Sequence, residues 1–456
     1  MELKGKRVLV VGMGRTGVPT ANRLHAMGAV VSVTDKGAVG RDEASKLSEG
    51  IDLETGSHDR ALAGKFDVVV TSPGVPWDGP ILQRHRERGA EVISEIELAF
   101  RLAPRAWIAI TGTNGKSTTT ALVGAMMRES GVGAVVCGNI GNAALGEDAI
   151  FDPRMKVVAE ISSFQLEGVA TFRPRVSAIL NITPDHMDRH KTMGEYIRLK
   201  RRIFELQRGD DVCVLNMDDP ETARLAPEVP CRLFPFSANG RLEEGVFVND
   251  GRIVISSRGD TWTAGATRDL RLPGRANLEN ALAACAIAFS AGADVGAISR
   301  ALSSFEALEH RLEPVAEVRG VRFINDSKGT NVGSTLKALD GMTGRVAVIL
   351  GGRDKDQDFT PLADLVRRMG AGVVLIGEAA EKIAVCLKGY EPVVRADGMD
   401  DAVRKAAQTA GAGGTVLLSP ACASFDMFRD YRDRGDKFRA AVRKLAGEPA
   451  LTGGRG

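Results

Sequence analysis

The residues with the clearest chemical potential form the segment TGTNGKST, from Thr111 to Thr118. A glycine turn of this kind lets backbone N–H groups approach the phosphates of a nucleotide, and the amino end of a following helix favours their negative charge. Lys116 would then contact the β- and γ-phosphates, and Ser117 would place its hydroxyl on Mg²⁺. The segment therefore predicts a nucleotide triphosphate site.

The surroundings of this segment fit the same prediction. A run typical of a buried strand precedes it at 107–110, and a helical run follows at 117–130. The strict phosphate-loop pattern is not met, because Ile110 stands five positions before Gly115, where a glycine is expected. A plain glycine turn with an incidental lysine is the alternative.

A second glycine-rich turn, GMGRTG, spans Gly12 to Gly17 directly after the first predicted strand, and Asp35 ends the next strand. This arrangement matches a dinucleotide-binding fingerprint, with the carboxylate on a ribose hydroxyl. Glycine-rich first turns also occur in α/β domains that bind other nucleotides or no nucleotide. The pattern alone leaves NAD or FAD binding and these other interpretations open.

A carboxylate and an imidazole follow two predicted strands of the middle region. Glu160 ends one strand in AEISSFQLE, and His186 lies in NITPDHMDRH after another. Residues just past the carboxyl ends of parallel strands converge on one crevice, so both side chains could hold Mg²⁺ or Mn²⁺ near Lys116. Alternatively, Glu160 caps the next helix and His186 is an ordinary loop residue. Lys200, in EYIRLKRRIF, has the pattern of a solvated helix lysine.

Three polar loops in the last third of the chain also follow predicted strands: NDSKGTN (325–331), GGRDK (351–355) and LSPACASFD (418–426). Their position at strand ends suggests one binding face for an anionic small molecule, or else ordinary loop chemistry.

The elements that would position these residues alternate between β-branched runs and helical runs. This alternation predicts parallel β-α-β units and an α/β fold. We expect domains at 1–94, 95–308 and 309–456. Runs from 232 to 263, with turns at Asn239-Gly240 and Asp250-Gly251, predict hairpins. The expected strands are 7–11, 30–34, 67–71, 107–110, 157–160, 176–180, 212–215, 345–350, 373–376 and 415–419, and the expected helices include 18–27, 117–130 and 277–290.

Composition narrows the class of protein. The net charge of +2 is too small for the broad positive field that attracts nucleic acid. Aromatic residues make up only 5% of the chain, which argues against surfaces on which bases stack. The six cysteines form no CxxC pair, which favours reduced thiols in a cytosol. The amino terminus has no signal-peptide pattern, and the most apolar stretch, 281–289, is too short to span a bilayer. We expect a cytoplasmic protein without membrane or nucleic-acid partners.

Taken together, the motifs resemble those of the Mur ligases, the cytoplasmic ligases of peptidoglycan precursors, over essentially the whole chain. TGTNGKST, EISSFQLE, NITPDHMDRH, PGRANLEN, EHR, NDSKGTN, GGRDKD and LSPACASFDMF occur in the family's order. The versions SSFQLE, HMDRH and SPACASFDMF look like those of members that add D-glutamate. The resemblance implies a Rossmann-like N-terminal domain for a UDP substrate, a P-loop-type central ATPase domain and a Rossmann-like C-terminal domain for the amino acid.

The resemblance also assigns roles to individual residues. The implied ATP contacts are Gly112, Thr113, Asn114, Gly115, Lys116, Ser117, Thr118, Asn277, Asn280, Arg311 and Asp326. The implied UDP-substrate contacts are Thr16, Asp35, Lys36, Ser72, Gly74 and Asn139, with Lys36 one residue earlier than the family's usual basic residue. The implied D-glutamate contacts are Lys328, Thr330, Lys355, Ser424, Phe425 and Tyr431. The implied metal ligands are Ser117, Glu160, His186 and Lys200, and the implied catalytic residues are Lys116, His186 and Lys200.

In this resemblance Lys200 is carbamylated, which reverses its interpretation as a solvated lysine, since a carbamate is an anion able to hold a second Mg²⁺. The implied activity is an ATP-dependent ligation of D-glutamate to UDP-N-acetylmuramoyl-L-alanine through an acyl phosphate, with two Mg²⁺ ions that Mn²⁺ could replace, by a monomer. The alternatives are a related ligase for another amino acid, an NAD-dependent oxidoreductase and a nucleotide-dependent switch protein.

Overall fold

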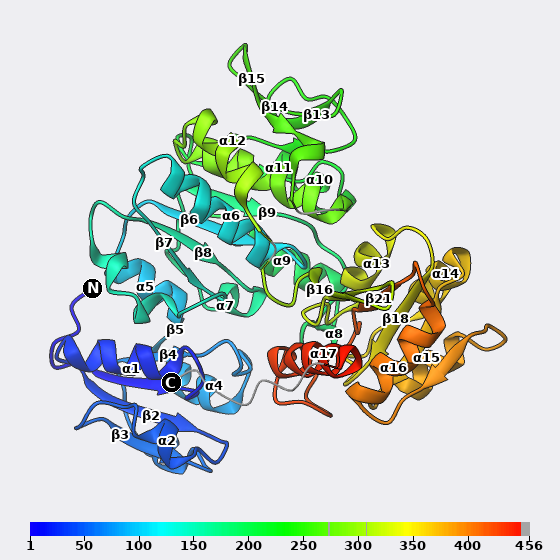
Figure 1. Ribbon diagram of the computed structural model, residues 1–456. Coiled ribbons are helices and arrows are strands. Elements are labelled where there is room, and N and C mark those ends of the chain that lie inside the picture. The colour runs from blue at the N-terminus through cyan, green and yellow to red at the C-terminus, as the bar shows by residue number, and fades with distance from the viewer. Residues whose placement is uncertain (272–273, 307, 448–456) are drawn as a thin grey trace. The chain divides into compact units, whose positions relative to one another are not determined.

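The computed structural model describes residues 1–271, 274–306 and 308–447 (Figure 1). Backbone contacts divide the chain into two compact units. The first contains Met1–Ile182, Gly194–Asp269 and Glu279–Ser304. The second contains Thr183–Met193, Leu270–Leu278 and the chain from Phe305 onward. The expected boundary near residue 94 lies inside the first unit and stays a prediction.

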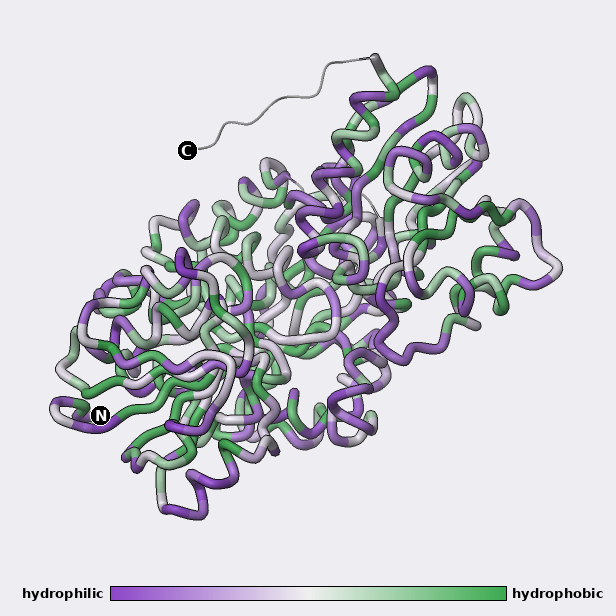
Figure 2. The backbone as a smooth tube through the Cα atoms, turned by 90° about the horizontal axis from the view of Figure 1, so that it is seen from below, coloured by the Kyte–Doolittle hydropathy of each residue, from purple (hydrophilic) through white to green (hydrophobic). Residues whose placement is uncertain are grey.

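The amino-terminal sheet has five parallel strands in the order β3-β2-β1-β4-β5. Its first strand is rich in valine and almost wholly buried, as expected for a strand covered on both faces. In Figure 2, stretches of the tube near the amino terminus are green, the colour of hydrophobic residues. The elements are β1 (Arg7–Val11), α1 (Gly17–Ala26), β2 (Val30–Asp35), α2 (Arg41–Ala44), β3 (Asp52–Thr55), α3 (Asp59–Ala63), β4 (Val68–Thr71), α4 (Pro80–Glu87), β5 (Glu91–Ser94) and α5 (Glu95–Leu102).

A second parallel sheet, in the order β11-β10-β9-β6-β8-β7, carries the phosphate-type turn at the end of its fourth strand in that order. Because its strands are parallel, the turn after β6 and the end of β8 share one edge. Its elements are β6 (Trp107–Thr111), α6 (Lys116–Glu129), β7 (Ala134–Gly138), η1 (Ala144–Gly146), η2 (Asp148–Phe151), β8 (Lys156–Glu160), α7 (Ser163–Glu167), β9 (Val176–Ile179), α8 (Met187–His190), α9 (Met193–Arg201), β10 (Val212–Leu215), α10 (Pro220–Arg224), η3 (Ala226–Glu228) and β11 (Arg232–Leu233).

A small four-stranded sheet follows, in the order β12-β13-β14-β15. The predicted hairpin turn at Asp250-Gly251 is confirmed, because β13 and β14 pair in antiparallel fashion around it. The prediction at Asn239-Gly240 is wrong, because β12 and β13 pair in parallel. The elements are β12 (Phe236–Ser237), β13 (Gly245–Asn249), β14 (Arg252–Ser257), β15 (Asp260–Ala266), η4 (Thr267–Asp269), α11 (Arg275–Ser290) and α12 (Val295–Ser304).

The carboxy-terminal sheet has the order β16-β17-β21-β18-β19-β20, with β16 antiparallel to β17 and the other pairs parallel. Two hydrophobic clusters cover its two faces. The elements are β16 (Glu313–Val318), β17 (Val321–Asn325), α13 (Val332–Asp340), β18 (Val346–Gly351), α14 (Thr360–Met369), β19 (Gly372–Ile376), α15 (Ala380–Cys386), β20 (Val393–Arg395), α16 (Met399–Ala410), β21 (Thr415–Leu418) and α17 (Tyr431–Ala446).

The predicted α/β class is confirmed by these sheets, and the predicted strands differ from the observed ones by one residue at most. β17, β21 and β18 are neighbours, so the three polar loops predicted to form one face do leave the same edge of the sheet. In the described part of the chain, none of the helices combines the length and apolar character needed to cross a bilayer.

Candidate active site

The turn between β6 and α6 has the shape that a phosphate site needs. Gly115 caps α6 with a φ of 85°, and a side chain there would meet the Oδ1 atom of Asn280 at 2.2 Å. Only glycine fits this left-handed, closely packed position. Asn181, two residues after β9, accepts from the N–H of Thr113 at 2.9 Å and from that of Asn114 at 2.8 Å. The sequence did not indicate this bracing role, although Asn181 opens NITPDHMDRH.

Two lysines meet at this turn. Lys116 Nζ donates to the Gly112 carbonyl at 2.9 Å and to the Thr113 carbonyl at 2.8 Å, and Lys200 Nζ donates to the same Gly112 carbonyl at 2.8 Å. Lys200 is 1% exposed, and its ammonium lies 4.5 Å from the centre of the Tyr196 ring. The interpretation of Lys200 as a solvated helix lysine is therefore wrong. The residue belongs to the same site as Lys116.

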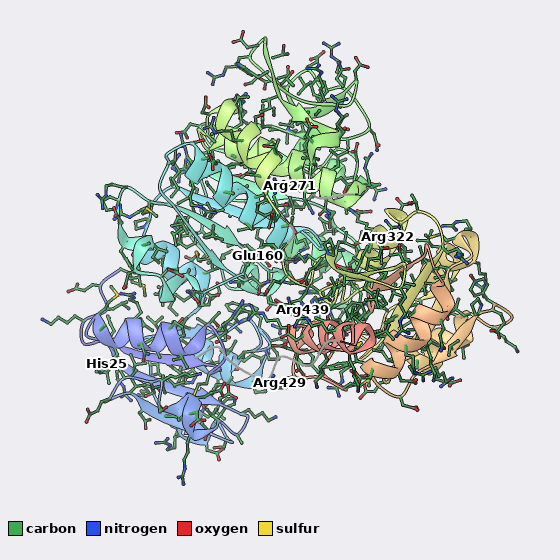
Figure 3. The ribbon with its side chains drawn as sticks, viewed as in Figure 1. His25, Glu160, Arg271, Arg322, Arg429 and Arg439 are labelled. Carbon is green, nitrogen blue, oxygen red and sulfur yellow. The ribbon has the colours of Figure 1, made fainter. Side chains whose placement is uncertain are left out.

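Glu160 ends β8, which pairs with β6 so that Glu160 lies opposite Ile110. The residue is 1% exposed on the central sheet (Figure 3), and its Oε1 atom accepts from Asn139 Nδ2 at 2.8 Å. The helix-cap alternative is wrong, because α7 is capped by Ser162 in a capping box with Gln165. A buried carboxylate thus stands one strand away from the lysine turn.

The amino-terminal sheet holds a cavity of about 540 Å³ at its own glycine turn. Gly17 must be glycine there, because a side chain would meet the Gly12 carbonyl oxygen at 1.9 Å. Asp35 accepts from the N–H of Met13 at 2.7 Å and that of Gly37 at 2.8 Å, which fixes the turn. All six residues expected to contact the UDP substrate line this cavity: Thr16, Asp35, Lys36, Ser72, Gly74 and Asn139.

The cavity is also lined by three residues with polar side chains that the sequence did not single out. They are Arg15, His58 and Gln165. Arg15 Nη2 donates to the Asn139 carbonyl at 2.8 Å, so the first glycine turn is tied to the residue that contacts Glu160. Arg15 stands inside GMGRTG and Gln165 inside SSFQLE, so their motifs were visible although their contacts were not.

A buried acid supports the wall of this cavity. Gln165 Nε2 donates to Glu95 Oε1 at 2.7 Å, and its Oε1 accepts from the Ser162 N–H at 2.8 Å. Burial raises the pKa of Glu95 to about 7, against the lowering effects of the Gln165 hydrogen bond and the Arg15 charge. The amide of Gln165 is held at both ends, so its orientation toward the cavity is fixed.

In the second unit, the loops after β17 and β21 bring several predicted residues together. Lys328 Nζ lies 4.9 Å from the centre of the Tyr431 ring, and Asp326 accepts from Ser419 Oγ at 2.7 Å. Burial raises the pKa of Asp326 to about 6, although the Ser419 hydrogen bond and the charge of Arg311 lower it. Arg311 and Asp326, both expected on the ATP side, are thus electrostatic neighbours.

Of the remaining predicted residues of this unit, Lys355 and His186 lie next to Asp185, and others lie in the loops after β17 and β21. Lys355 Nζ pairs with Asp185 Oδ1 at 3.3 Å, and His186 follows Asp185 with its Nε2 atom 3.7 Å from Asp185 Oδ2. Asp185, which the sequence did not single out, therefore joins two predicted residues. Ser424 is buried and Phe425 is 62% exposed in the loop after β21. Thr330 is partly exposed in the loop after β17.

The four predicted metal ligands are thus distributed over both units. Ser117, Glu160 and Lys200 belong to the first and His186 to the second, and Asn277 and Asn280 are divided in the same way. Among the described residues, no three His, Cys, Asp or Glu side chains form a group that could hold a metal. The donors of the first unit, a hydroxyl and a buried carboxylate, still suit Mg²⁺ if phosphate oxygens complete its shell.

Comparison with known proteins identifies the family of this chain. Residues 6–94 match the family described as Mur ligase MurD-like, N-terminal domain, residues 110–288 match the Mur ligase middle domain, and residues 310–422 match the Mur ligase, glutamate ligase domain. The UDP-N-acetylmuramoylalanine–D-glutamate ligase of Geotalea daltonii is 46% identical over 98% of this chain and 99% of its own. The protein of the same name from Thermoanaerobacter pseudethanolicus is 42% identical over 98% and 100%.

Solved structures share the fold at lower identity. A pseudomurein peptide ligase type C from Methanothermus fervidus superposes with a TM-score of 0.63 at 20% identity, covering 97% of this chain and 100% of its own. The MurF ligase of Thermotoga maritima in complex with ADP gives a TM-score of 0.59 at 15% identity, covering 98% and 96%. From the three family matches and the full-length relatives, the chain belongs to the Mur ligase family.

Proposed function

We propose that this chain is the ATP-dependent ligase that joins D-glutamate to UDP-N-acetylmuramoyl-L-alanine in the synthesis of peptidoglycan precursors. The relatives that carry this name match the chain over almost its full length. The observation that supports it most strongly is the convergence of Lys116 and Lys200 on the Gly112 carbonyl, beside the buried Glu160. This cluster of cations and an acid suits a triphosphate with its metal ions.

The proposal gives each part of the chain one task. Residues 1–94 hold the UDP end of the substrate, 95–308 hold ATP, and 309–456 hold the amino acid. The cavity at the first glycine turn favours this assignment, because it offers backbone N–H groups together with Arg15 and Lys36 to a pyrophosphate. We propose that the chain acts as a monomer in the cytoplasm.

The reaction begins with a carboxylate, which is a poor electrophile. The terminal carboxylate of the UDP substrate attacks the γ-phosphorus of ATP, which forms an acyl phosphate and releases ADP. The neutral amine of D-glutamate then attacks the acyl carbon, and phosphate leaves as the amide forms. Two anions must approach each other in the first step, so the chain has to supply positive charge there.

Lys116 is the residue best placed to supply that charge. Its ammonium is held by two carbonyls of its own turn, from which it can move onto the β- and γ-phosphates. Ser117, Glu160, His186 and Lys200 would hold two Mg²⁺ ions, which Mn²⁺ could replace. When bound, these ions would offset the negative charge of the phosphates.

A carbamate on Lys200 would resolve a conflict in the first unit. Two lysine side chains share one carbonyl in a buried site, so their like charges repel each other. Addition of CO₂ to the neutral Lys200 amine releases a proton and leaves an anion in place of a cation. That anion would attract Lys116 and serve as a metal ligand.

On the amino-acid side, we propose that Lys328, Thr330, Lys355, Ser424, Phe425 and Tyr431 contact D-glutamate. Arg311 and Asp326 would contact ATP from the second unit, with Asn277 and Asn280 from α11. Lys355 is paired with Asp185 in the structure, so a carboxylate of D-glutamate would compete for its ammonium. The ion pair with Asp185 shows that the Lys355 ammonium can pair with a carboxylate at this position.

The test is phosphate release from ATP in the presence of UDP-N-acetylmuramoyl-L-alanine and one amino acid at a time. We expect release with D-glutamate and only background release with L-alanine, L-lysine or diaminopimelate. Equal release with another of these amino acids would identify a related ligase instead. Hydride transfer to NAD without any ATP consumption would support an oxidoreductase, and slow ATP hydrolysis without an amide product would support a switch protein.

A further inference from the structure

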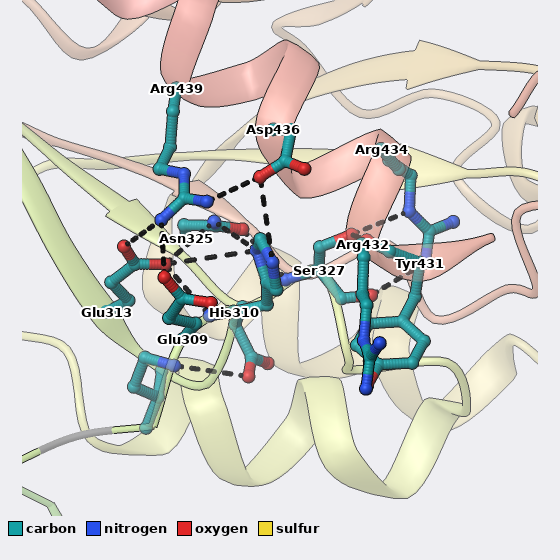
Figure 4. A network of polar contacts seen from close by, with 12 residues as sticks. Glu309, His310, Glu313, Asn325, Ser327, Tyr431, Arg432, Arg434, Asp436 and Arg439 are labelled. Atoms are coloured by element: carbon teal, nitrogen blue, oxygen red, sulfur yellow. Dashed lines mark hydrogen bonds and ion pairs between the residues drawn. The ribbon is translucent and has the colours of Figure 1, made fainter. Parts of the chain in front are cut away.

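One fully buried arginine joins the loops of the second unit. Arg434 lies in the first turn of α17 and is 0% exposed. Its Nε donates to Ser327 Oγ at 3.0 Å and its Nη2 to the Ser327 carbonyl at 2.7 Å (Figure 4). Its Nη1 donates to the carbonyls of Cys422 at 3.0 Å and Ala423 at 3.3 Å. One guanidinium therefore holds the loop after β17 and the loop after β21.

The residues that Arg434 holds are the immediate neighbours of proposed substrate contacts. Ser327 stands between Asp326 and Lys328, and Ala423 directly precedes Ser424. The Ser327 hydroxyl in turn donates to the carbonyl of Tyr431 at 2.8 Å. A shift of the guanidinium would thus displace the backbone on which these side chains are mounted.

The third polar loop packs against the same group. Arg353 and Ala423 exchange two backbone hydrogen bonds, of 2.9 and 3.0 Å. A side chain at Gly352 would meet the Ala423 carbonyl at 2.2 Å and Arg434 Nη1 at 3.3 Å. The loop after β18 therefore closes the space around the guanidinium, and the group has little freedom to move.

Only an arginine can make this set of bonds. Its planar head offers several N–H donors in fixed directions, which here serve three carbonyls and a hydroxyl. A lysine ammonium is a single point on a flexible stem and cannot span both loops at once. A lysine at this position would keep the charge but lose the cross-link.

The charge of Arg434 has no direct counter-ion. Among the described residues, no carboxylate forms an ion pair with it, since its partners are carbonyls and a hydroxyl. Burial lowers its pKa to about 10, so the group remains a cation at neutral pH. Asp326 and Asp426 act on it only from a distance. The three carbonyls and the hydroxyl that accept from the guanidinium therefore stabilise this buried cation.

We propose that Arg434 is a positioning residue for the amino-acid substrate. It fixes the loops that carry Lys328 and Ser424, the residues proposed to contact that substrate. This inference rests on the proposed function, because it assumes that these loops receive D-glutamate.

The first test compares Arg434→Lys with the wild-type chain in steady-state ligation. We expect the KM for D-glutamate to rise about tenfold to a hundredfold, because several hydrogen bonds to a charged group are lost. The KM for the UDP substrate should stay within about twofold, and the KM for ATP should rise less than that for D-glutamate, because Asp326 beside Ser327 is the only one of the neighbouring contacts assigned to ATP. Arg443→Lys, at an exposed position of the same helix, is the matched control and should change none of these values.

An unchanged KM for D-glutamate in Arg434→Lys would overturn the inference. So would an equal rise in KM for all three substrates, which would indicate a general distortion of the site. If circular dichroism shows that Arg434→Lys does not fold, Ser327→Ala takes its place. That variant removes one acceptor of Arg434 and should raise the KM for D-glutamate by about threefold to tenfold, more than the KM for ATP or for the UDP substrate. An unchanged value there would contradict the inference equally.

The wild-type reaction separates this inference from the proposed function. If the wild-type chain consumes no ATP with D-glutamate, the proposed function fails. If the wild-type chain is active and neither variant changes the KM for D-glutamate, only the role of Arg434 fails.

Discussion

The first unit contains two glycine turns of similar design, and they differ in charge. Each follows a buried parallel strand and opens a helix, GMGRTG before α1 and TGTNGKST before α6. Two lysine ammoniums converge on the turn before α6. The turn before α1 has no lysine of its own, and the carboxylate of Asp35 fixes its backbone. The turn before α6 thus brings two ammoniums onto one carbonyl, whereas the turn before α1 has Arg15 and a carboxylate bonded to its backbone.

This difference teaches that the turn shape alone does not define the ligand. Glycine turns before helices suit anions in general, but a triphosphate that must transfer a phosphoryl group needs more positive charge than a pyrophosphate that is only held. In the proposed function, the nearby charges distinguish the turn assigned to catalysis from the turn assigned to binding. Asn139 connects the two, since it accepts from Arg15 and donates to Glu160.

The largest expected effect removes the charge from the catalytic turn. Lys116→Ala should lower kcat by about a thousandfold, because the charge that developing phosphate oxygens need is lost. Calorimetric binding of the UDP substrate to the first turn should remain. The control is Lys156→Ala, a lysine that also donates to a carbonyl, that of Ala291, but starts β8 at the opposite edge of the sheet. Near-normal ligation by Lys116→Ala would refute the comparison.

A buried acid beside the binding turn gives the next effect. The folded-state pKa of Glu95 is raised to about 7 from 4.5, so its contribution to stability is present below pH 4.5 and lost as the pH rises to about 7. The Glu95→Gln variant has no carboxyl to ionise at this buried position, so it does not lose stability as the pH rises. At pH 8 its free energy of unfolding should exceed that of the wild type by about 1–3 kcal/mol. The two proteins should converge near pH 4.5. Chemical denaturation at several pH values measures this, with the exposed Glu49→Gln as control. A pH-independent difference would contradict the assignment.

A similar stability change should follow from crowding the binding turn itself. Gly17→Ala places a methyl group against the Gly12 carbonyl and should destabilise the chain by about 1–3 kcal/mol. Gly14→Ala, in the same turn, meets no atom within 4 Å and should be nearly neutral. Thermal unfolding of the two variants separates them. Equal melting temperatures would show that the turn is less tightly packed than described.

The smallest effect tests the link between the two turns. Arg15→Met removes a solvent-exposed hydrogen bond, which Arg15 donates to the Asn139 carbonyl. We expect the KM for the UDP substrate to rise about threefold to tenfold, the effect of one charged hydrogen bond. Arg41→Met, at an exposed position of the same domain, is the control. No change in Arg15→Met would mean that the two turns act independently.

Much of the fold could be predicted from the sequence, because buried parallel strands are short β-branched runs with glycine-rich turns behind them. The parallel pairing of β12 with β13 could not be predicted, because β12 is only two residues long and Phe236 also bridges to Asn216, which is distant in the chain. Turn residues predict a local reversal of the chain, but they do not predict which strand a short segment pairs with.

The burial of Lys200 was readable but was missed. In α9 it shares a helical face with Tyr196 and Leu199, both buried, and a charged residue in such a stripe signals a buried role. Arg434 stands in the same relation to Phe438 and Ala441 in α17. The contacts of Asn181, Asp185 and Arg15 had no such signal, because they join residues far apart in the chain.

The most direct test of the account is the location of metal ions in a crystal structure with Mn²⁺, a non-hydrolysable ATP analogue and the UDP substrate. Anomalous scattering should place Mn²⁺ beside Glu160 and Ser117, with Lys200 carbamylated and Lys116 on the phosphates. Manganese bound elsewhere, or an unmodified Lys200 still on the Gly112 carbonyl while the analogue is bound, would contradict the proposed site.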